Sequence, residues 1–183
     1  MVIKKKIFFY KDITLKKILF KDIEKLRKER NSHFIRSKML NQKIITKNDQ
    51  LKWFKNIHKL QNDRYFCIYD KKTIVGFCSI KEINRSNLNC TWGFYVFKKF
   101  KGIYGPIIEY KILEYIFDKL KMRKIYGYTL SSNHEILKIH KFFGFRKEGI
   151  LKRHILINKK EHDLILTSLF LKDWKNIKRK IIK

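Results

Sequence analysis

Alanine is absent from this chain of 183 residues, and proline occurs only once. Arginine is scarce as well, because 9 of the 45 basic residues are arginine and 36 are lysine, whereas isoleucine occurs 28 times. Lys, Ile, Asn, Phe and Tyr have AT-rich codons, and Ala, Pro and Gly have GC-rich ones. The composition is therefore typical of an AT-rich genome, and the formal net charge of +29 does not by itself indicate a polyanionic partner.

Long apolar runs are missing too. None reaches the roughly 18 residues that a membrane-spanning helix needs, and the apolar run after the basic start is too short for a signal peptide. We therefore expect a cytoplasmic protein with no membrane partner. No repeat and no low-complexity linker divides the chain, so its length predicts one domain.

Paired cysteines are also lacking. Cys67, Cys78 and Cys90 each fall inside a predicted strand, and none forms a Cys-x-x-Cys pair. The sequence therefore predicts buried, reduced thiols and no metal site.

Alternating strand and helix signals fill most of the chain, and they predict a mixed α/β sheet with helices on both faces. The expected strands are 5–16, 64–70, 73–81, 89–97, 124–130, 145–157 and 162–171, and the expected helices are 22–30, 34–40, 46–59, 105–120 and 134–143. We expect the domain to span residues 1–174, followed by a basic tail over 175–183. The lysine-rich end from Lys172 should be frayed and solvated.

The loop between the strand at 89–97 and the next helix can bind phosphate. Lys101, Gly102, Tyr104 and Gly105 stand directly before the helix, and Pro106 suits its first turn. Glycine lets backbone N–H groups face an anion, and a helix N-terminus attracts one. An ordinary strand-to-helix turn would explain the same residues. Gly93 in the strand itself would ease a departure from the neighbouring strand, or would lie in a plain core strand.

The next strand-to-helix junction carries a second polar group. Ser132 or Asn133 can cap the helix, with Glu135 completing a capping box. His140 lies on the same face as Ile139, where a packed core histidine is one interpretation. Imidazole titrates near neutrality, so proton transfer is the other.

The order of these motifs resembles the acyl-CoA core of the GNAT (GCN5-related N-acetyltransferase) superfamily. The resemblance implies a single GNAT domain whose central strands splay into a V, with acetyl-CoA as co-substrate and no metal. Its pyrophosphate would lie at the loop and its pantetheine along the strand. The implied cofactor-binding residues are Tyr95, Val96, Phe97, Lys101, Gly102, Tyr104, Gly105 and Asn133. Tyr104 stands where the superfamily pattern has its central glycine.

The resemblance also implies the catalytic group. His140 stands where the superfamily usually has the tyrosine that protonates the departing thiolate, and several amine-acetylating branches have histidine there. Thr91 and Tyr128 stand where many acetyltransferases place a carboxylate base. No carboxylate base is evident in the sequence. We therefore expect a water relayed by His140, Tyr128 or Thr91 to deprotonate the amine.

A narrower resemblance comes from motifs at both ends of the chain. Arg30-Asn31, Ile35-Arg36, Trp53, Phe145-x-x-Glu148-Gly149 with His154, and Asp163-Leu-Ile are similar to the UDP-4-amino-4,6-dideoxy-N-acetyl-altrosamine N-acetyltransferases of pseudaminic acid synthesis, which serves flagellin glycosylation. Gln50 stands where that branch often has histidine. The resemblance implies that the acceptor is the 4-amino group of a UDP-linked amino-dideoxy sugar. It implies substrate contacts at Arg30, Asn31, Arg36, Trp53 and His154, although the same residues could cap helices and fill the core.

Two other functions stay open. One is a protein N-terminal acetyltransferase of the ribosomal-protein type. The other is a non-enzymatic basic module that binds nucleic acid, which would explain the charge of +29 directly. Arginine is scarce and no nucleic-acid motif is present, so we expect a small-molecule partner and no specific nucleic acid. The sequence leaves a homodimer open.

Overall fold

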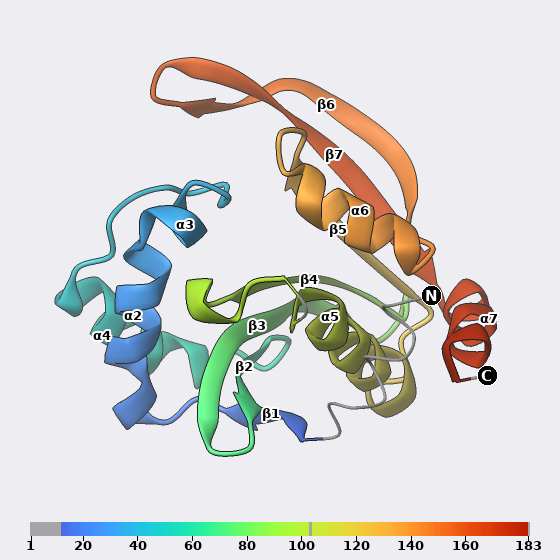
Figure 1. The fold of residues 1–183 in the computed structure, drawn as a ribbon, viewed down its shortest axis with the longest axis horizontal. Coiled ribbons are helices and arrows are strands. Elements are labelled where there is room, and N and C mark those ends of the chain that lie inside the picture. The colour runs from blue at the N-terminus through green and yellow to red at the C-terminus, as the bar shows by residue number, and fades with distance from the viewer. Residues whose placement is uncertain (1–11, 103, 183) are drawn as a thin grey trace.

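The computed structural model describes residues 12–102 and 104–182 and arranges them around one mixed sheet (Figure 1). The sheet has seven strands in the order β1-β2-β3-β4-β5-β7-β6. Its strands are β1 (Ile13–Lys17), β2 (Arg64–Asp70), β3 (Thr73–Asn84), β4 (Asn89–Val96), β5 (Lys124–Leu130), β6 (Arg146–Ile157) and β7 (Lys160–Phe170). Neighbouring strands are antiparallel except β4 and β5, which are parallel. The predicted mixed α/β sheet is confirmed.

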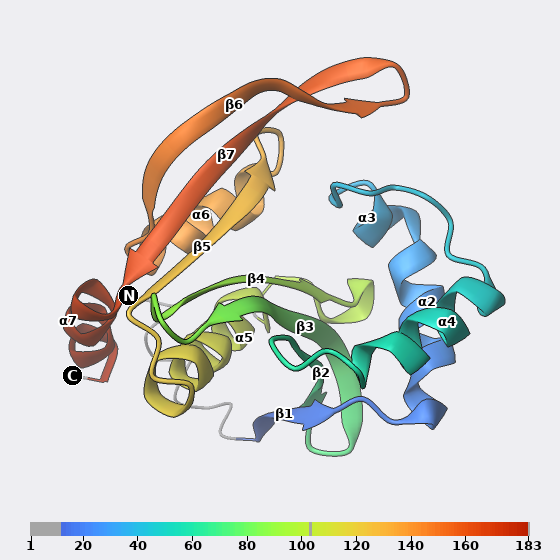
Figure 2. The same ribbon diagram turned by 180° about the vertical axis from the view of Figure 1, so that it is seen from behind.

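The sheet splits between β4 and β5. These strands pair only over residues 89–91 and 124–126. Beyond Thr91, β4 stays paired with β3 as far as Val96, whereas β5 continues beside β7. The predicted V between the central strands is therefore confirmed, and Figure 2 shows the two halves of the sheet diverging from their point of contact.

Helices α5 (Tyr104–Glu114) and α6 (His134–Phe142) lie beside each other on one face of the sheet. Apolar residues recur along α5 with the helical period, so Ile108, Ile112 and Leu113 are fully buried against the strands. The helix predicted over 105–120 is confirmed, but its last part, Tyr115–Lys119, is wound as a wider π-helical turn.

The opposite face of β2, β3 and β4 is covered by α2 (Ile23–Asn31), α3 (His33–Arg36) and α4 (Lys47–Ile57), after the short turn η1 (Phe20–Asp22). Side chains alternate along a strand, so Phe66 and Cys67 of β2 point to opposite faces of the sheet. Phe66 packs in a first apolar cluster, between the sheet and α5. Cys67 packs in a second apolar cluster, between the sheet and the helices α2, α3 and α4. Thr46 caps α4, because its hydroxyl accepts a hydrogen bond from the Asp49 backbone N–H at 3.1 Å. The helix predicted over 34–40 is shorter and ends at Arg36.

The capping box predicted at the start of α6 is wrong. Asn133 stands at the N-cap position, but its side chain makes no capping hydrogen bond. The Glu135 carboxylate instead accepts from the Lys38 ammonium at 2.8 Å, because the segment after α3 approaches α6 there. This leaves the Asn133 amide available to the cleft described below.

The expectation of a frayed C-terminal end is also wrong. Helix α7 (Leu171–Ile182) continues the chain after β7, and Trp174 and Ile181 are buried in the main core. Ile177 packs where a Cβ on Gly144 would stand, and Gly144 has a φ of +79° that suits glycine. The boundary predicted after residue 174 stays a prediction, although α7 crosses it without a break.

The strand predicted over 5–16 is tested only in part. Its residues 5–11 lie outside the described residues, and β1 runs over Ile13–Lys17. In the part of the chain that the structure describes, no helix has both the length and the apolar character to cross a membrane.

Candidate functional site

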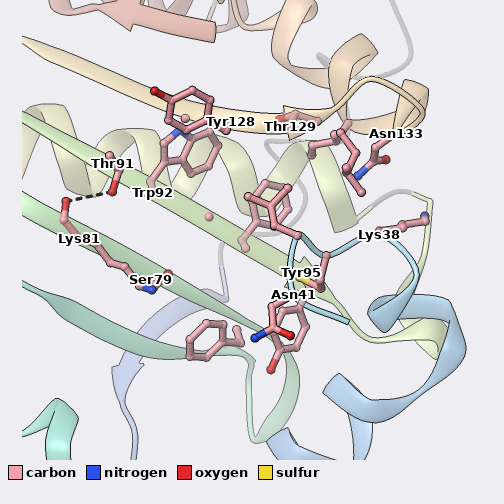
Figure 3. A pocket seen from close by; sticks show the side chains of 18 of the residues that line it. Lys38, Asn41, Ser79, Lys81, Thr91, Trp92, Tyr95, Tyr128, Thr129 and Asn133 are labelled. Atoms are coloured by element: carbon pink, nitrogen blue, oxygen red, sulfur yellow. Dashed lines mark hydrogen bonds between the residues drawn. The ribbon is translucent and has the colours of Figure 1, made fainter. Parts of the chain in front are cut away.

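The divergence of β4 from β5 opens a cleft with a volume of about 370 Å³ (Figure 3). Its walls come from β3, β4, β5, α6 and the segment after α3. Trp92 and Tyr95 of β4 face it from one side and Tyr128 and Thr129 of β5 from the other, with Asn133 at the start of α6. Gly93 lies on the same wall, and a Cβ added there would meet no atom within 4 Å.

The three residues predicted to be catalytic meet in this cleft. Thr91 is the last residue of β4 that pairs with β5, Tyr128 follows the divergence on β5, and His140 lies on α6. The Thr91 hydroxyl donates a hydrogen bond of 3.4 Å to the Lys81 carbonyl oxygen, and Tyr128 is 44% exposed. Their convergence agrees with the prediction, and their catalytic roles remain predictions.

Behind His140 lies a carboxylate that the sequence interpretation missed. The Nδ1 atom of His140 is 2.9 Å from Oε1 of Glu109 on α5, and Glu109 is 0% exposed. Burial raises the pKa of the Glu109 carboxyl, and the adjacent imidazole acts in the opposite direction. Trp92 and Phe145 pack against the imidazole with ring centroids 5.4 Å and 4.7 Å away. The cleft therefore holds a histidine backed by a buried acid.

A signal for Glu109 was present in the sequence. It stands three residues before Ile112 and seven before Ile116, so it lies on the apolar stripe that α5 turns toward the core. A glutamate on such a stripe is seldom buried without a partner. The periodicity could have indicated a buried acid, but the partner is 31 positions away in the chain.

A second, smaller cavity of about 90 Å³ adjoins the cleft at the start of α5. Six of the eight residues predicted to bind the cofactor line it, namely Tyr95, Val96, Lys101, Gly102, Gly105 and Asn133. Gly102 has a φ of +90°, which lets the loop turn its backbone toward the helix N-terminus. Beyond Thr91, the edge of β4 that faces this region has no strand partner on the β5 side.

The other two predicted cofactor residues do not line this cavity. Phe97 is 1% exposed and packs in the second apolar cluster, and its backbone N–H donates to the Val75 carbonyl oxygen at 2.9 Å. The Tyr104 hydroxyl donates to an oxygen of Asp70 at 2.6 Å, which ties the start of α5 to the turn between β2 and β3. Tyr104 stands at the position of the central glycine of the superfamily pattern, and here its side chain anchors the start of α5 to Asp70.

A third cavity of about 310 Å³ continues from the cleft under α2 and α4, sharing Arg30, Ser79 and Lys81 with it. Trp53 lines this third cavity, and Arg30 lines both. One Arg30 nitrogen donates to the Asn41 carbonyl oxygen, while Nη1 is buried and has no hydrogen-bond partner within residues 12–102 and 104–182. Burial lowers the pKa of the Arg30 guanidinium.

The remaining predicted substrate residues lie outside these cavities. The Asn31 amide bonds the backbone N–H and carbonyl of Ile45, both at 2.8 Å, so it fixes the segment before α4. Arg36 donates to the Gln42 carbonyl oxygen, and its buried Nε has no hydrogen-bond partner in the described part of the chain. His154 is exposed on β6. The structure therefore brings together Arg30 and Trp53 and leaves these three apart.

A comparison with protein families matches residues 15–166 to the acetyltransferase (GNAT) domain. The chain belongs to the GNAT acetyltransferase family. This match confirms the resemblance to the GNAT superfamily and the prediction of an N-acetyltransferase. The matched segment contains every residue that lines the two flanking cavities, all those that line the cleft except Thr167, and the Glu109–His140 pair.

Relatives of this GNAT protein are distant. Acetyltransferase PseH of Campylobacter jejuni subsp. jejuni is 28% identical over 104 residues, which are 57% of this chain and 64% of that protein. The chain thus spans less than two thirds of that relative. The putative ribosomal N-acetyltransferase YdaF of Bacillus subtilis is 25% identical over 113 residues, 61% of each protein.

A solved structure confirms the fold. Spermidine N-acetyltransferase from Vibrio cholerae, in complex with CoA and spermine, superposes with a TM-score of 0.82 at 21% identity, covering 90% of this chain and 99% of that chain. At that identity the likeness extends to the GNAT fold and no further.

Lysines at the cleft were not predicted either. Lys81 lines the cleft and the third cavity, and Lys38 lines the cleft and the second cavity. With so many lysines in the chain, composition gave no reason to single these two out.

Among the described residues, no group of three or more His, Cys, Asp or Glu side chains is placed to hold a metal ion.

Proposed function

We propose that this GNAT protein transfers the acetyl group of acetyl-CoA to the 4-amino group of a UDP-linked amino-dideoxy sugar, as in pseudaminic-acid-type glycan synthesis. The observation that carries the proposal is the row of three adjoining cavities, with Thr91, Tyr128 and His140 in the middle one. A co-substrate and an acceptor that enter from the two ends would meet beside His140.

Acetyl-CoA fits the loop end of this row. The free edge of β4 offers backbone N–H and C=O groups to the pantetheine amides, which would add to the sheet like a short strand. Lys101, Gly102 and the N-terminus of α5 would attract the pyrophosphate. The Asn133 amide, which lines both the cleft and the second cavity, would bond the pantetheine arm. The thioester would then lie in the cleft near His140.

The chain's own residues would move protons around the reacting atoms. The amine attacks the thioester carbonyl directly, with no covalent intermediate on the protein. It must first lose a proton, and the cleft offers His140, Tyr128 and Thr91 to relay it through water. His140 would then protonate the leaving thiolate. The aromatic rings of Trp92 and Phe145 shield the imidazole from bulk water.

The charge of the cleft favours an anionic acceptor. Its lining contains Arg30, Lys38 and Lys81, and no Asp or Glu among the described residues. A polyamine, which the structural relative from Vibrio cholerae binds, would be repelled by this lining, whereas the two phosphates of a UDP-sugar would be attracted. The sequence relationship to acetyltransferase PseH also supports a nucleotide-sugar acceptor.

The second candidate acceptor is the N-terminal amine of a protein. The relationship to the putative ribosomal N-acetyltransferase YdaF supports it. A peptide chain would need a groove that continues beyond the reacting amine, and the third cavity, with Trp53 and Tyr65, could accept its side chains. Charge is the property that separates this candidate from the UDP-sugar.

A panel of acceptors tests the proposal. Release of free thiol from acetyl-CoA would be measured with UDP-4-amino-sugars, spermidine and N-terminal peptides. We expect the highest kcat/KM with a UDP-amino-sugar, and inhibition without thiol release by a UDP-sugar that lacks a free amine. Faster turnover of spermidine or a peptide would overturn the acceptor. Absence of acetyl-CoA binding by calorimetry, at high micromolar protein and low salt, would overturn the enzymatic function itself.

A further inference from the structure

Glu109 occupies a position where a carboxylate is costly. It is 0% exposed on α5, between the buried residues Ile108 and Tyr110. Its Oε1 contacts the His140 imidazole at 2.9 Å, and its Oε2 is buried with no hydrogen-bond partner among the described residues. Transferring a carboxylate out of water costs several kcal/mol unless its charge is paired and its oxygens are bonded. An apolar side chain at this position would avoid that cost.

The presence of Glu109 at this buried position must therefore be explained by its hydrogen bond to His140. No other ionisable side chain within the described residues forms a hydrogen bond or ion pair with Glu109 or with His140. The side chains that face the imidazole from the other elements are the aromatic rings of Trp92 and Phe145. These rings fix the plane of the imidazole but cannot choose which nitrogen carries a proton. Glu109 can, because an ionised carboxylate only accepts hydrogen bonds and so favours the tautomer that carries the proton on Nδ1.

We propose that Glu109 is a positioning residue for His140: its carboxylate accepts a hydrogen bond from Nδ1–H, and Nε2 is thereby left as the atom that exchanges protons in the cleft. This inference rests on the acetyl transfer proposed above. It supplies a carboxylate that the sequence motifs do not assign to the site, and it places that carboxylate behind the imidazole instead of beside the amine.

The protons balance in this arrangement. An acceptor ammonium loses two protons on becoming an amide, and the first passes to solvent before attack. The amine nitrogen then forms the bond to the thioester carbon. Nε2 takes the second proton from the nitrogen of the tetrahedral adduct, which makes the imidazole a cation held beside the Glu109 carboxylate. As the carbon–sulfur bond breaks, Nε2 returns this proton to the thiolate, and the products are an amide and free CoA thiol.

The first test observes the imidazole itself and needs no acceptor. Nitrogen-15 chemical shifts of His140 would be recorded in the full chain across pH, with assignment from His140→Gln. We expect Nδ1 to carry the proton when the ring is neutral. In Glu109→Gln the neutral amide can either accept from Nδ1 or donate to it, so the preference for the Nδ1–H tautomer should weaken. A neutral ring with its proton on Nε2 in the native protein, or the same tautomer ratio in the variant as in the native protein, overturns the inference.

The second test asks whether Glu109 acts through His140. Glu109→Gln should lower kcat at least tenfold and change the calorimetric affinity for acetyl-CoA less than twofold. In a His140→Gln background, the same substitution should cause no further loss. Equal losses in both backgrounds would show a merely structural role and overturn the inference. Glu114→Gln is the matched control, since Glu114 lies on the same helix, pairs with Lys111 and Lys178, and should leave both readouts unchanged.

The two proposals fail separately. If acetyl-CoA does not bind, the proposed function falls, while the nitrogen shifts still decide the tautomer of His140. If acetyl-CoA binds and is consumed but Glu109→Gln is indistinguishable from the native chain, the function stands and the positioning role falls. Circular dichroism of each variant checks the fold, and Gln keeps the volume of Glu so that the packing of α5 against α6 is preserved.

Discussion

In the proposed reaction, proton transfer in the cleft depends on His140. It lines the cleft but not the second cavity at the start of α5. His140→Ala should therefore lower kcat by about 10²–10⁴, the usual contribution of a general acid or base, while the affinity for acetyl-CoA stays nearly unchanged. Single-turnover thiol release and calorimetry measure the two effects. The control is His134→Ala, an exposed change on the same helix. An unaffected rate would return His140 to the interpretation as a packed core residue.

Lys81 allows a test of where the phosphates of the proposed acceptor bind. It lines both the cleft and the third cavity and is exposed to any ligand there. Lys81→Gln should raise KM for a UDP-amino-sugar several-fold, with kcat little changed, because one favourable charge near the phosphates is lost. The effect should shrink at high salt. Lys72→Gln, in the turn between β2 and β3, removes the same charge away from the cleft and should have no effect. If both variants behaved alike, the acceptor phosphates would not lie at Lys81.

At the scale of the elements, local signals predicted most of the fold. The strands over 64–70 and 124–130 have the predicted bounds, and the helix predicted over 46–59 is present as α4. Predictions failed where long-range contacts decide the outcome. Lys172 begins a lysine-rich end whose charge suggested fraying, but Trp174 and Ile181 reach the core. Glu109 shows the same limit at the site, because a core stripe reveals a buried position and not the partner on another helix.

Helix α7 is thus predicted to be part of the folded unit. Ending the chain after Trp174 removes Ile177, which packs at Gly144, and the buried Ile181. A buried isoleucine contributes about 1.5–3 kcal/mol, and each kcal/mol corresponds to about 2–4 °C in a chain of this size. We expect Tm to fall by about 5 °C or more in a thermal melt. Lys175→Gln with Lys180→Gln, which alter only exposed positions, should not lower it. An unchanged Tm after truncation would support the predicted tail.

The hairpin of β6 and β7 has its own pH signature. Glu148 accepts from Ser168 at 2.6 Å and pairs with Lys124 at 2.7 Å, so it joins β6 to β7 and β5. The hydrogen bonds from Lys124 and Ser168 lower the pKa of Glu148. Since the folded value lies below the ordinary 4.5, the stabilisation is present above that pH and is lost as the pH falls through the folded value. The Tm advantage of the native chain over Glu148→Gln should therefore shrink below pH 4.5. Glu161→Gln is the control, because Glu161 belongs to a mostly exposed ion pair. The Tm difference between the native chain and this variant should not change across the same pH range.

At the scale of the whole molecule, the separation of the two halves of the sheet is what creates the cleft. The parallel pairing of β4 and β5 ends at Thr91, and the chain uses the two separated halves of the sheet as opposite walls of the cleft. Helices α5 and α6 then bring Glu109 and His140 together behind it. The V could be expected from a family resemblance but not from strand patterns, because residue alternation does not reveal where two paired strands part.

The charge of the whole chain gives the last prediction. A formal net charge of +29 attracts any polyanion at low salt, but lysine supplies 36 of the 45 basic residues, and the cations that line the cleft stand in cavities too small for a duplex. Binding that rests on dispersed lysines releases counterions and weakens steeply as salt rises. We therefore expect duplex and single-stranded oligonucleotides to bind weakly at low salt, without sequence preference, and to dissociate near physiological salt in a fluorescence anisotropy titration. Lysine-rich chains of similar charge but another fold should give the same slope. Submicromolar binding that persists at physiological salt, and that CoA displaces poorly, would instead assign the charge to a nucleic-acid partner.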